Sequence, residues 1–184
     1  MSNEKSSWKR LNRKTLYDSR FMKMYEDTVE LPSGHLMDDY SVVDLPDGVL
    51  VVATDEENNV LVIDEYKYAA DDTFLTFVAG GIDGSESVLE AARRELVEET
   101  GYDTDDLELL AQLDVYPSKV IHKSSIVRAR NIRKVTTTNH EASEGIGNIR
   151  LISPAELKSS LKGGKIKTTY MLAAIALAFP EILG

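Results

Sequence analysis

The chain has 184 residues, enough for one well-buried domain with a small appendage. The absence of cysteine excludes disulfides, thiolate catalysis and cysteine-based zinc sites, and it fits a reducing, cytoplasmic location. The net charge of −10 argues against a nucleic-acid partner. The longest apolar run, Tyr170 to Phe179, is too short to span a bilayer, so we expect no membrane partner.

Residues 1–45 predict a small antiparallel β subdomain. Tyr25 to Leu31 alternates loosely, and His35 to Val43 can return as its partner strand after a Pro-Ser-Gly turn. Seven of the first 23 residues are Lys or Arg. This basic segment either approaches an anionic ligand or pairs with an acidic neighbour. Pro46-Asp47-Gly48 marks a boundary, which divides the chain into domains 1–45 and 46–184.

The second domain alternates strands and helices. Val49 to Ala53 and Val60 to Asp64 predict strands that a hairpin-like loop joins, and Phe74 to Val78 predicts another strand. The strongest helix begins at Ser87, which forms a capping box with Glu90, and stops at Gly101. Later strands are expected at Leu107–Leu113, Ser125–Ala129 and Ile149–Ile152, and later helices from Pro154 and from Thr168 to Ala178. This order predicts an α/β fold in which helices cover a mixed sheet.

Three carboxylates share one face of the strongest helix, because Glu95, Glu98 and Glu99 lie at positions i, i+3 and i+4. Arg94 offsets only part of their mutual repulsion, so a cation should complete the arrangement. Oxygen-only donors favour Mg²⁺, Mn²⁺ or Ca²⁺. The preceding Gly80-Gly81 lets the main chain come close to a ligand. The alternative is a solvated acidic helix face.

The spacing of this stretch is more specific than its charge. The defined positions are Gly80-x5-Glu86-x7-Arg94-Glu95-Leu96-x-Glu98-Glu99-x-Gly101-Tyr102. They resemble a complete Nudix box, on a helix that capping signals place independently. The resemblance implies an α/β/α Nudix sandwich that hydrolyses a nucleoside diphosphate linked to another group.

The resemblance also implies roles for the residues of the box. Glu95, Glu98 and Glu99, with the Ala79 carbonyl, would bind Mg²⁺, for which Mn²⁺ can substitute. Arg94 would pair with a glutamate of the box, and Glu86 would be a distant metal contact or a helix-start charge. Gly80 and Gly101 would shape the two loops.

Hydrolysis also needs a carboxylate that accepts the proton of the attacking water. In the similar ADP-ribose pyrophosphatases this group sits on a loop well after the box. The corresponding loop here is Asn139 to Gly145, so Glu144 is the first candidate base and Glu141 the second. With Arg94 and Glu98 they make up the predicted catalytic set. The alternative is an acidic surface loop without a catalytic role.

Outside the box, Pro117 within Tyr116-Pro117-Ser118, the segment Glu65-Tyr66-Lys67-Tyr68 and the β-rich amino-terminal extension resemble the ADP-ribose and ADP-sugar pyrophosphatase branch. In those relatives the β-rich amino-terminal extension is exchanged between two subunits, which implies a homodimer. Lys67 stands where relatives often have arginine, and lysine cannot grip a phosphate in the same bidentate way. The predicted substrate-binding residues are Lys67, Pro117, Arg20, Phe21 and Lys123.

The leading hypothesis is therefore a Mg²⁺-dependent pyrophosphatase of ADP-ribose or a related nucleoside diphosphate sugar, which releases a nucleoside monophosphate and a sugar phosphate. The nearest alternative is GDP-mannose or another nucleoside diphosphate derivative on the same scaffold. A third is a non-catalytic Nudix domain that senses a nucleotide, although such a domain has no need of a full glutamate cluster.

Overall fold

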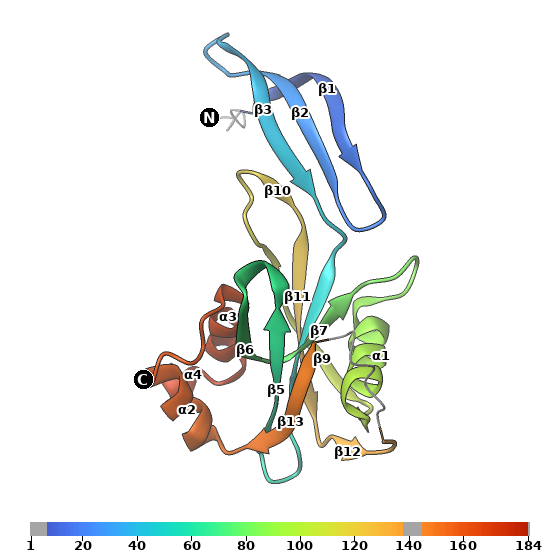
Figure 1. Cartoon of the computed structure of the whole chain (residues 1–184), viewed down its shortest axis with the longest axis vertical. Coiled ribbons are helices and arrows are strands. Elements are labelled where there is room, and N and C mark those ends of the chain that lie inside the picture. Colours follow the sequence, from blue (N-terminus) through green and yellow to red (C-terminus); the bar gives the residue numbers. More distant parts are fainter. Residues whose placement is uncertain (1–6, 138–144, 184) are drawn as a thin grey trace, which may run out of the picture. The chain divides into compact units, whose positions relative to one another are not determined.

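The structure is a computed structural model that describes residues 7–137 and 145–183 (Figure 1). It divides into two compact units. The N-terminal unit lies within residues 1–47 and 114–123, and the core unit lies within residues 48–113 and 124–184. Segment 114–123, which the sequence pattern places with the second domain, thus belongs to the N-terminal unit.

The N-terminal unit is a four-stranded sheet in the order β1-β2-β3-β10. Its strands are β1 (Lys9–Asp18), β2 (Lys23–Glu30), β3 (Leu36–Asp44) and β10 (Val120–Ile121). The first three pair antiparallel in sequence order, and β10 adds in parallel to β3. The two strands expected in this region are β2 and β3, whereas β1 is an additional strand.

Two basic residues of β1 pair with acidic residues of β2. The Arg13 guanidinium donates hydrogen bonds from Nε and Nη2 to the two oxygens of buried Asp27, both of 2.7 Å. Lys14 lies 3.3 Å from Glu26. For Arg13 and Lys14, this arrangement confirms the interpretation that the basic segment pairs with an acidic neighbour.

The described part of the core unit contains two larger sheets and four α-helices. One sheet has the order β7-β4-β11-β9, with β4 parallel to β11 and antiparallel to β7; the other, β13-β5-β6, is antiparallel. A short pair, β12 with β8, completes the strands. The strands are β4 (Gly48–Ala53), β5 (Val60–Lys67), β6 (Asp72–Thr76), β7 (Val78–Gly81), β8 (Tyr102–Asp103), β9 (Asp106–Asp114), β11 (Lys123–Arg130), β12 (Arg133–Lys134) and β13 (Ile146–Ile152). The helices are the 3-10 turn η1 (Tyr68–Ala70), α1 (Val88–Thr100), α2 (Pro154–Lys162), α3 (Thr169–Ala178) and α4 (Pro180–Leu183).

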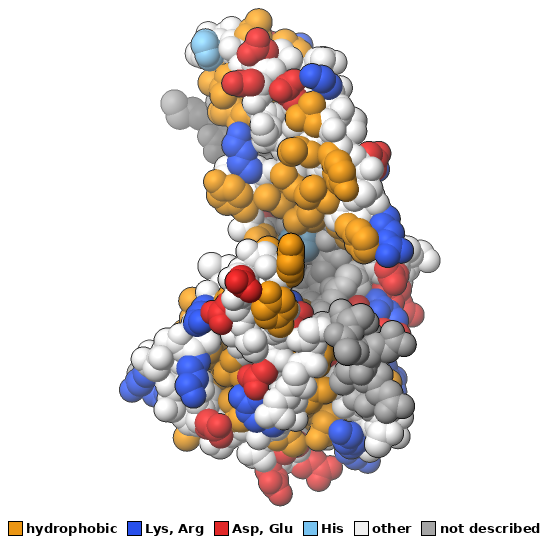
Figure 2. Space-filling model, in the orientation of Figure 1, with side chains coloured by type: hydrophobic (Ala, Val, Ile, Leu, Met, Phe, Trp, Pro, Cys, Tyr) orange, Lys and Arg blue, Asp and Glu red, His pale blue; other side chains and the backbone are white. Residues whose placement is uncertain are grey.

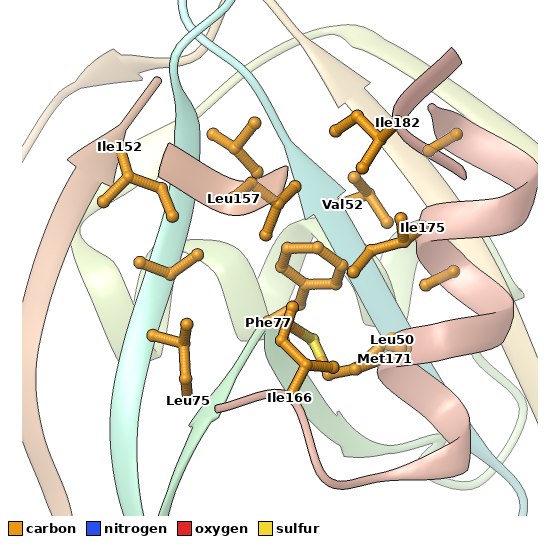
Figure 3. Packing of buried hydrophobic residues seen from close by; sticks show 14 of the residues in the cluster. Leu50, Val52, Leu75, Phe77, Ile152, Leu157, Ile166, Met171, Ile175 and Ile182 are labelled. Carbon is orange, nitrogen blue, oxygen red and sulfur yellow. The ribbon is translucent and has the colours of Figure 1, made fainter. Parts of the chain in front are cut away.

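Buried side chains form two clusters, one on each face of the strands. Alternate residues of a strand point to opposite faces. Val51 accordingly joins the cluster that contains Leu96 of α1. Its neighbour Val52 joins the cluster that contains Phe77 and side chains of α2, α3 and α4. Figure 3 shows this second cluster, with Phe77 among Val52, Leu157, Met171 and Ile175. The strands therefore lie between α1 and the other helices, as expected of an α/β/α sandwich.

One local prediction held only in part and another was wrong. The hairpin-like loop after β4 is present and is closed by an antiparallel bridge between Thr54 and Val60, but β4 and β5 then enter different sheets. The single strand expected at Phe74–Val78 is two strands, because the chain changes sheet at Phe77. That side chain is completely buried in the core, so burial of Phe77 fixes the point at which the chain crosses over.

The described helices are all too short or too polar to cross a membrane.

Candidate active site

Helix α1 carries the predicted site and has the predicted ends. The Ser87 hydroxyl accepts a hydrogen bond from the Glu90 N–H, and the Glu90 carboxylate accepts one of 2.7 Å from the Ser87 N–H. Gly101 ends the helix with a φ of +73°, a conformation that favours glycine. Ala92 and Leu96 are fully buried. They fix the rotation of the helix and thereby the direction in which its glutamates project.

Arg94 ties the glutamates of this region together. Its Nη2 donates to Glu86 Oε1 and to the Gly81 carbonyl, each at 2.8 Å or less. Its Nη1 donates to Glu95 Oε1 at 2.8 Å and to Glu98 Oε2 at 3.1 Å. These carboxylates, Glu86 first, hold the pKa of Arg94 above its usual range. The arrangement confirms that Arg94 pairs with glutamates of the box.

Glu86 serves as the anchor of Arg94 and as a charge near the start of the helix. Hydrogen bonds from Arg94, and then from the Asp83 N–H, hold the pKa of Glu86 below its usual value. Glu86 precedes α1 by two residues, so its charge lies at the start of the helix.

Glu99 and Glu95 are carboxylates in a desolvated setting. Burial, then the neighbouring charges of Glu95 and Glu65, raise the pKa of Glu99 to about 8. The Ala79 N–H and the Lys67 ammonium oppose this rise. Burial also raises the pKa of Glu95, against the effect of Arg94. The site thus contains acidic groups that a cation would stabilise in their charged form.

Gly80 is required by the close approach of strand β7 to the helix. A Cβ atom at this position would lie 1.9 Å from Glu95 Cδ, whereas a Cβ at Gly81 would meet no atom within 4 Å. Among the residues that the structure describes, no three acidic or histidine side chains already converge on a metal-binding point. Arg94 bridges Glu95 and Glu98 instead. The oxygen-only donor set and the two desolvated carboxylates nevertheless fit a hard divalent cation.

Glu65 is a site residue that the sequence reasoning missed. It lies on β5, forms an ion pair with Lys67, and places its charge near Glu99. The alternation of side chains along a strand offered a signal. Leu61, Ile63 and Glu65 lie on the same side of β5, and Leu61 and Ile63 pack in the α1 cluster. The sequence alone does not reveal that β5 lies beside α1.

The remaining predicted residues are divided between the two units. Lys67 ends β5 and pairs with Glu65, and its charge acts on Glu99. Arg20, Phe21, Pro117 and Lys123 belong to the N-terminal unit, where the Arg20 guanidinium lies 4.3 Å from the centre of the Phe21 ring. Glu141 and Glu144 lie outside the described residues.

Comparisons with known proteins agree with this geometry. The NUDIX domain model matches residues 44–173, and the model of the nucleoside diphosphate sugar hydrolase N-terminal domain matches residues 8–43. The chain is 29% identical over 117 residues to the methanol dehydrogenase activator of Bacillus methanolicus, covering 62% of this chain and 63% of that protein. It is 40% identical over 76 residues to the ADP compounds hydrolase NudE of Escherichia coli, covering 41% of each. The match thus spans less than two thirds of both relatives.

A solved structure of an ADP compounds hydrolase superposes with a TM-score of 0.81 at 26% identity, and the match covers 96% of this chain and 95% of that one. The fold of nearly the whole chain, the N-terminal β unit included, therefore occurs in a known protein. The chain belongs to the NUDIX domain family, with a nucleoside diphosphate sugar hydrolase N-terminal domain.

Proposed function

We propose that this protein hydrolyses the pyrophosphate bond of ADP-ribose or a related nucleoside diphosphate sugar, releasing a nucleoside monophosphate and a sugar phosphate. The observation that carries the proposal is the cluster of Glu95, Glu98 and Glu99, with Arg94 holding two of them and Glu99 desolvated. The matching N-terminal domain and the hydrolases of ADP compounds support the substrate class.

Mg²⁺ is the proposed cofactor, and Mn²⁺ can replace it. Glu95, Glu98 and Glu99 would hold the ion, with the Ala79 carbonyl as a further ligand. When bound, the ion neutralises the charge of the pyrophosphate and orients a water molecule. The burial that raises the pKa of Glu99 supports this assignment, because a divalent cation favours the ionised carboxylate.

The protein's own residues would position the glutamates and take the proton of the attacking water. Arg94 positions Glu95 and Glu98 through its Nη1 hydrogen bonds. Gly80 leaves the room that the Glu95 carboxylate occupies. Lys67, on the β5 side of the glutamates, would meet a substrate phosphate. Glu144, or failing it Glu141, would accept the proton of the attacking water.

The N-terminal unit would make the protein a homodimer and bring Arg20, Phe21, Pro117 and Lys123 to the substrate. Hydrophobic side chains gather on this unit in Figure 2. Its large exposed hydrophobic residues are Trp8, Leu11, Leu16, Tyr17, Phe21, Leu36, Tyr116 and Ile121. Such patches mark interaction surfaces. We place the enzyme in the cytoplasm, which the lack of cysteine supports.

The dimer is tested by measuring molar mass in solution. Phe21 exposes 66% of its surface, so Phe21→Asp should shift the mass toward one chain without unfolding the protein. Asn12→Asp, at an exposed position on β1, adds the same single negative charge and is the matched control. A wild-type mass of one chain at all concentrations would refute the dimer.

The activity is tested with Mg²⁺ and ADP-ribose beside GDP-mannose, ADP-glucose and NADH, with both products identified. Glu98→Gln and Glu99→Gln should each lose roughly a hundredfold or more in kcat. Glu57→Gln, on the turn between β4 and β5, is the control and should keep its activity. Preference for GDP-mannose would retain the enzyme class and refute the substrate. Nucleotide binding without hydrolysis of any substrate would favour the sensor.

A further inference from the structure

The core unit contains a cavity of about 250 Å³ that the proposed reaction does not use. Its walls come from β5, β6, β13, α2 and the segment between α2 and α3. The lining residues are Asp64, Thr73, Leu75, Arg150, Ile152, Glu156, Ser160, Lys165 and Lys167. It is somewhat smaller than a typical pocket for a drug-sized ligand, which suits a smaller molecule.

The sheet separates this cavity from the glutamates of α1. Asp64 lines the cavity, while the next residue, Glu65, acts on Glu99. Consecutive side chains of a strand point to opposite faces. The apolar part of the cavity, Leu75 and Ile152, also belongs to the cluster of α2 and α3, as Figure 3 shows. The cavity is therefore a second site, on the far face from the box.

Polar groups in the lining lack partners. Ser160 exposes only 8% of its surface, and its hydroxyl has no hydrogen bond within the described residues. A buried hydroxyl without a partner costs free energy that a bound ligand can recover. Likewise, within residues 7–137 and 145–183, the Lys165 ammonium has no ion-pair partner.

The other two cations retain donor capacity. Arg150 pairs with Asp64 at 2.5 Å, and Lys167 pairs with Asp72 at 2.6 Å. An ammonium has three N–H donors and a guanidinium five, so each keeps donors for a ligand. The set of available groups is therefore rich in donors, and it suits a ligand with several acceptor oxygens, such as a phosphoryl group.

Glu156 offers a contact for a second part of the ligand. Its carboxylate lines the cavity and has no cation partner in the described part of the chain. A carboxylate accepts hydrogen bonds from hydroxyl groups. A ligand with a phosphoryl group at one end and hydroxyls at the other matches both.

We propose that this cavity binds a small sugar phosphate, with its phosphoryl group at Lys165, Lys167 and Ser160 and its hydroxyls at Glu156. The ligand is of the same class as one product of the proposed reaction, but the site lies apart from the box. Binding is therefore measured without turnover, and it stands or falls independently of the proposed activity.

The test is calorimetric titration of the full chain with ribose 5-phosphate and with inorganic phosphate, in a phosphate-free buffer that contains EDTA. Lys165→Ala and Ser160→Ala should each raise the Kd of ribose 5-phosphate about tenfold or more, which corresponds to about 1.4 kcal/mol. Lys162→Ala is the matched control, since Lys162 is exposed at the end of α2 and does not line the cavity. It should change the Kd less than about twofold, and Lys165→Arg should retain binding because it keeps the charge.

The two ligands distinguish a sugar phosphate from inorganic phosphate as the source of the phosphoryl group. Tighter binding of ribose 5-phosphate than of phosphate, with Glu156→Gln weakening only the ester, supports the proposal. Equal affinity for the two ligands would overturn the sugar part of it. Equal losses in Lys162→Ala and Lys165→Ala would show diffuse electrostatic attraction and overturn the site, as would the absence of saturable binding.

Discussion

The close approach at Gly80 predicts a large catalytic effect from a single methyl group. In Gly80→Ala the new Cβ would lie 1.9 Å from Glu95 Cδ, and ordinary van der Waals contact begins at 3.4 Å, so the carboxylate must move by 3.4 − 1.9 = 1.5 Å. A misplacement of about 1 Å can reduce a rate about a hundredfold. We expect kcat to fall by at least that factor, with a loss of stability of only about 1–2 kcal/mol from the disturbed hydrogen bond between Arg94 and Glu95.

The assay compares Gly80→Ala with Gly81→Ala for Mg²⁺-dependent hydrolysis of ADP-ribose and for thermal unfolding. An added Cβ at Gly81 meets no atom within 4 Å, and the Gly81 carbonyl that Arg94 uses is retained. The control should therefore keep its kcat within about threefold of the wild type, less than 0.7 kcal/mol. The reasoning fails if Gly80→Ala is as active as the control, or if both variants lose activity equally.

Three further predictions use charged groups. Arg94→Lys loses the forked guanidinium that joins Glu86, Glu95 and Glu98, so kcat should fall roughly ten- to a hundredfold. The control Arg93→Lys, at an exposed pair with Asp103, should leave steady-state kinetics unchanged. Because the pKa of Glu99 is raised, its protonation contributes to the stability of the metal-free protein; the contribution is complete below about pH 4.5 and is lost as pH rises through about 8. Melting curves in EDTA should show that Glu99→Gln removes this decline. Arg13→Ala leaves Asp27 without its partner and should cost about 1–3 kcal/mol in urea unfolding, since Arg13 is partly exposed and water can reach the carboxylate once it is removed. Because Arg13 lowers the pKa of Asp27, the wild-type advantage should persist at neutral pH and vanish only in acid below the ordinary pKa of 3.8; an advantage unaffected by acid would contradict the pairing.

The parts predicted well are those that local chemistry determines. Helix α1 has the predicted ends because its cap, its buried stripe and its terminal glycine are neighbours in sequence. The pairing of Arg94 with glutamates was likewise predictable, since the partners lie on one helix or just before it. The family resemblance added the fold, which local patterns alone did not specify.

The features of the fold and the site that the sequence did not reveal depend on contacts between distant residues or lack a sequence pattern. Strand β1 is exposed along nearly its whole length, so it shows no hydrophobic alternation, and only its pairing with β2 defines it. Val120 pairs with Val43 and Ile121 with Asp44, although the partners lie 77 positions apart in sequence. The influence of Glu65 on Glu99 also depends on how strand and helix pack.

Strand β1 has a consequence for solubility. It forms an edge of its sheet and carries four cations, Lys9, Arg10, Arg13 and Lys14. An unprotected edge invites strand addition and fibre growth, and charged side chains discourage it. Two such edges brought together would place like charges opposite each other. The proposed association of two copies is therefore directed away from edge-to-edge pairing at β1.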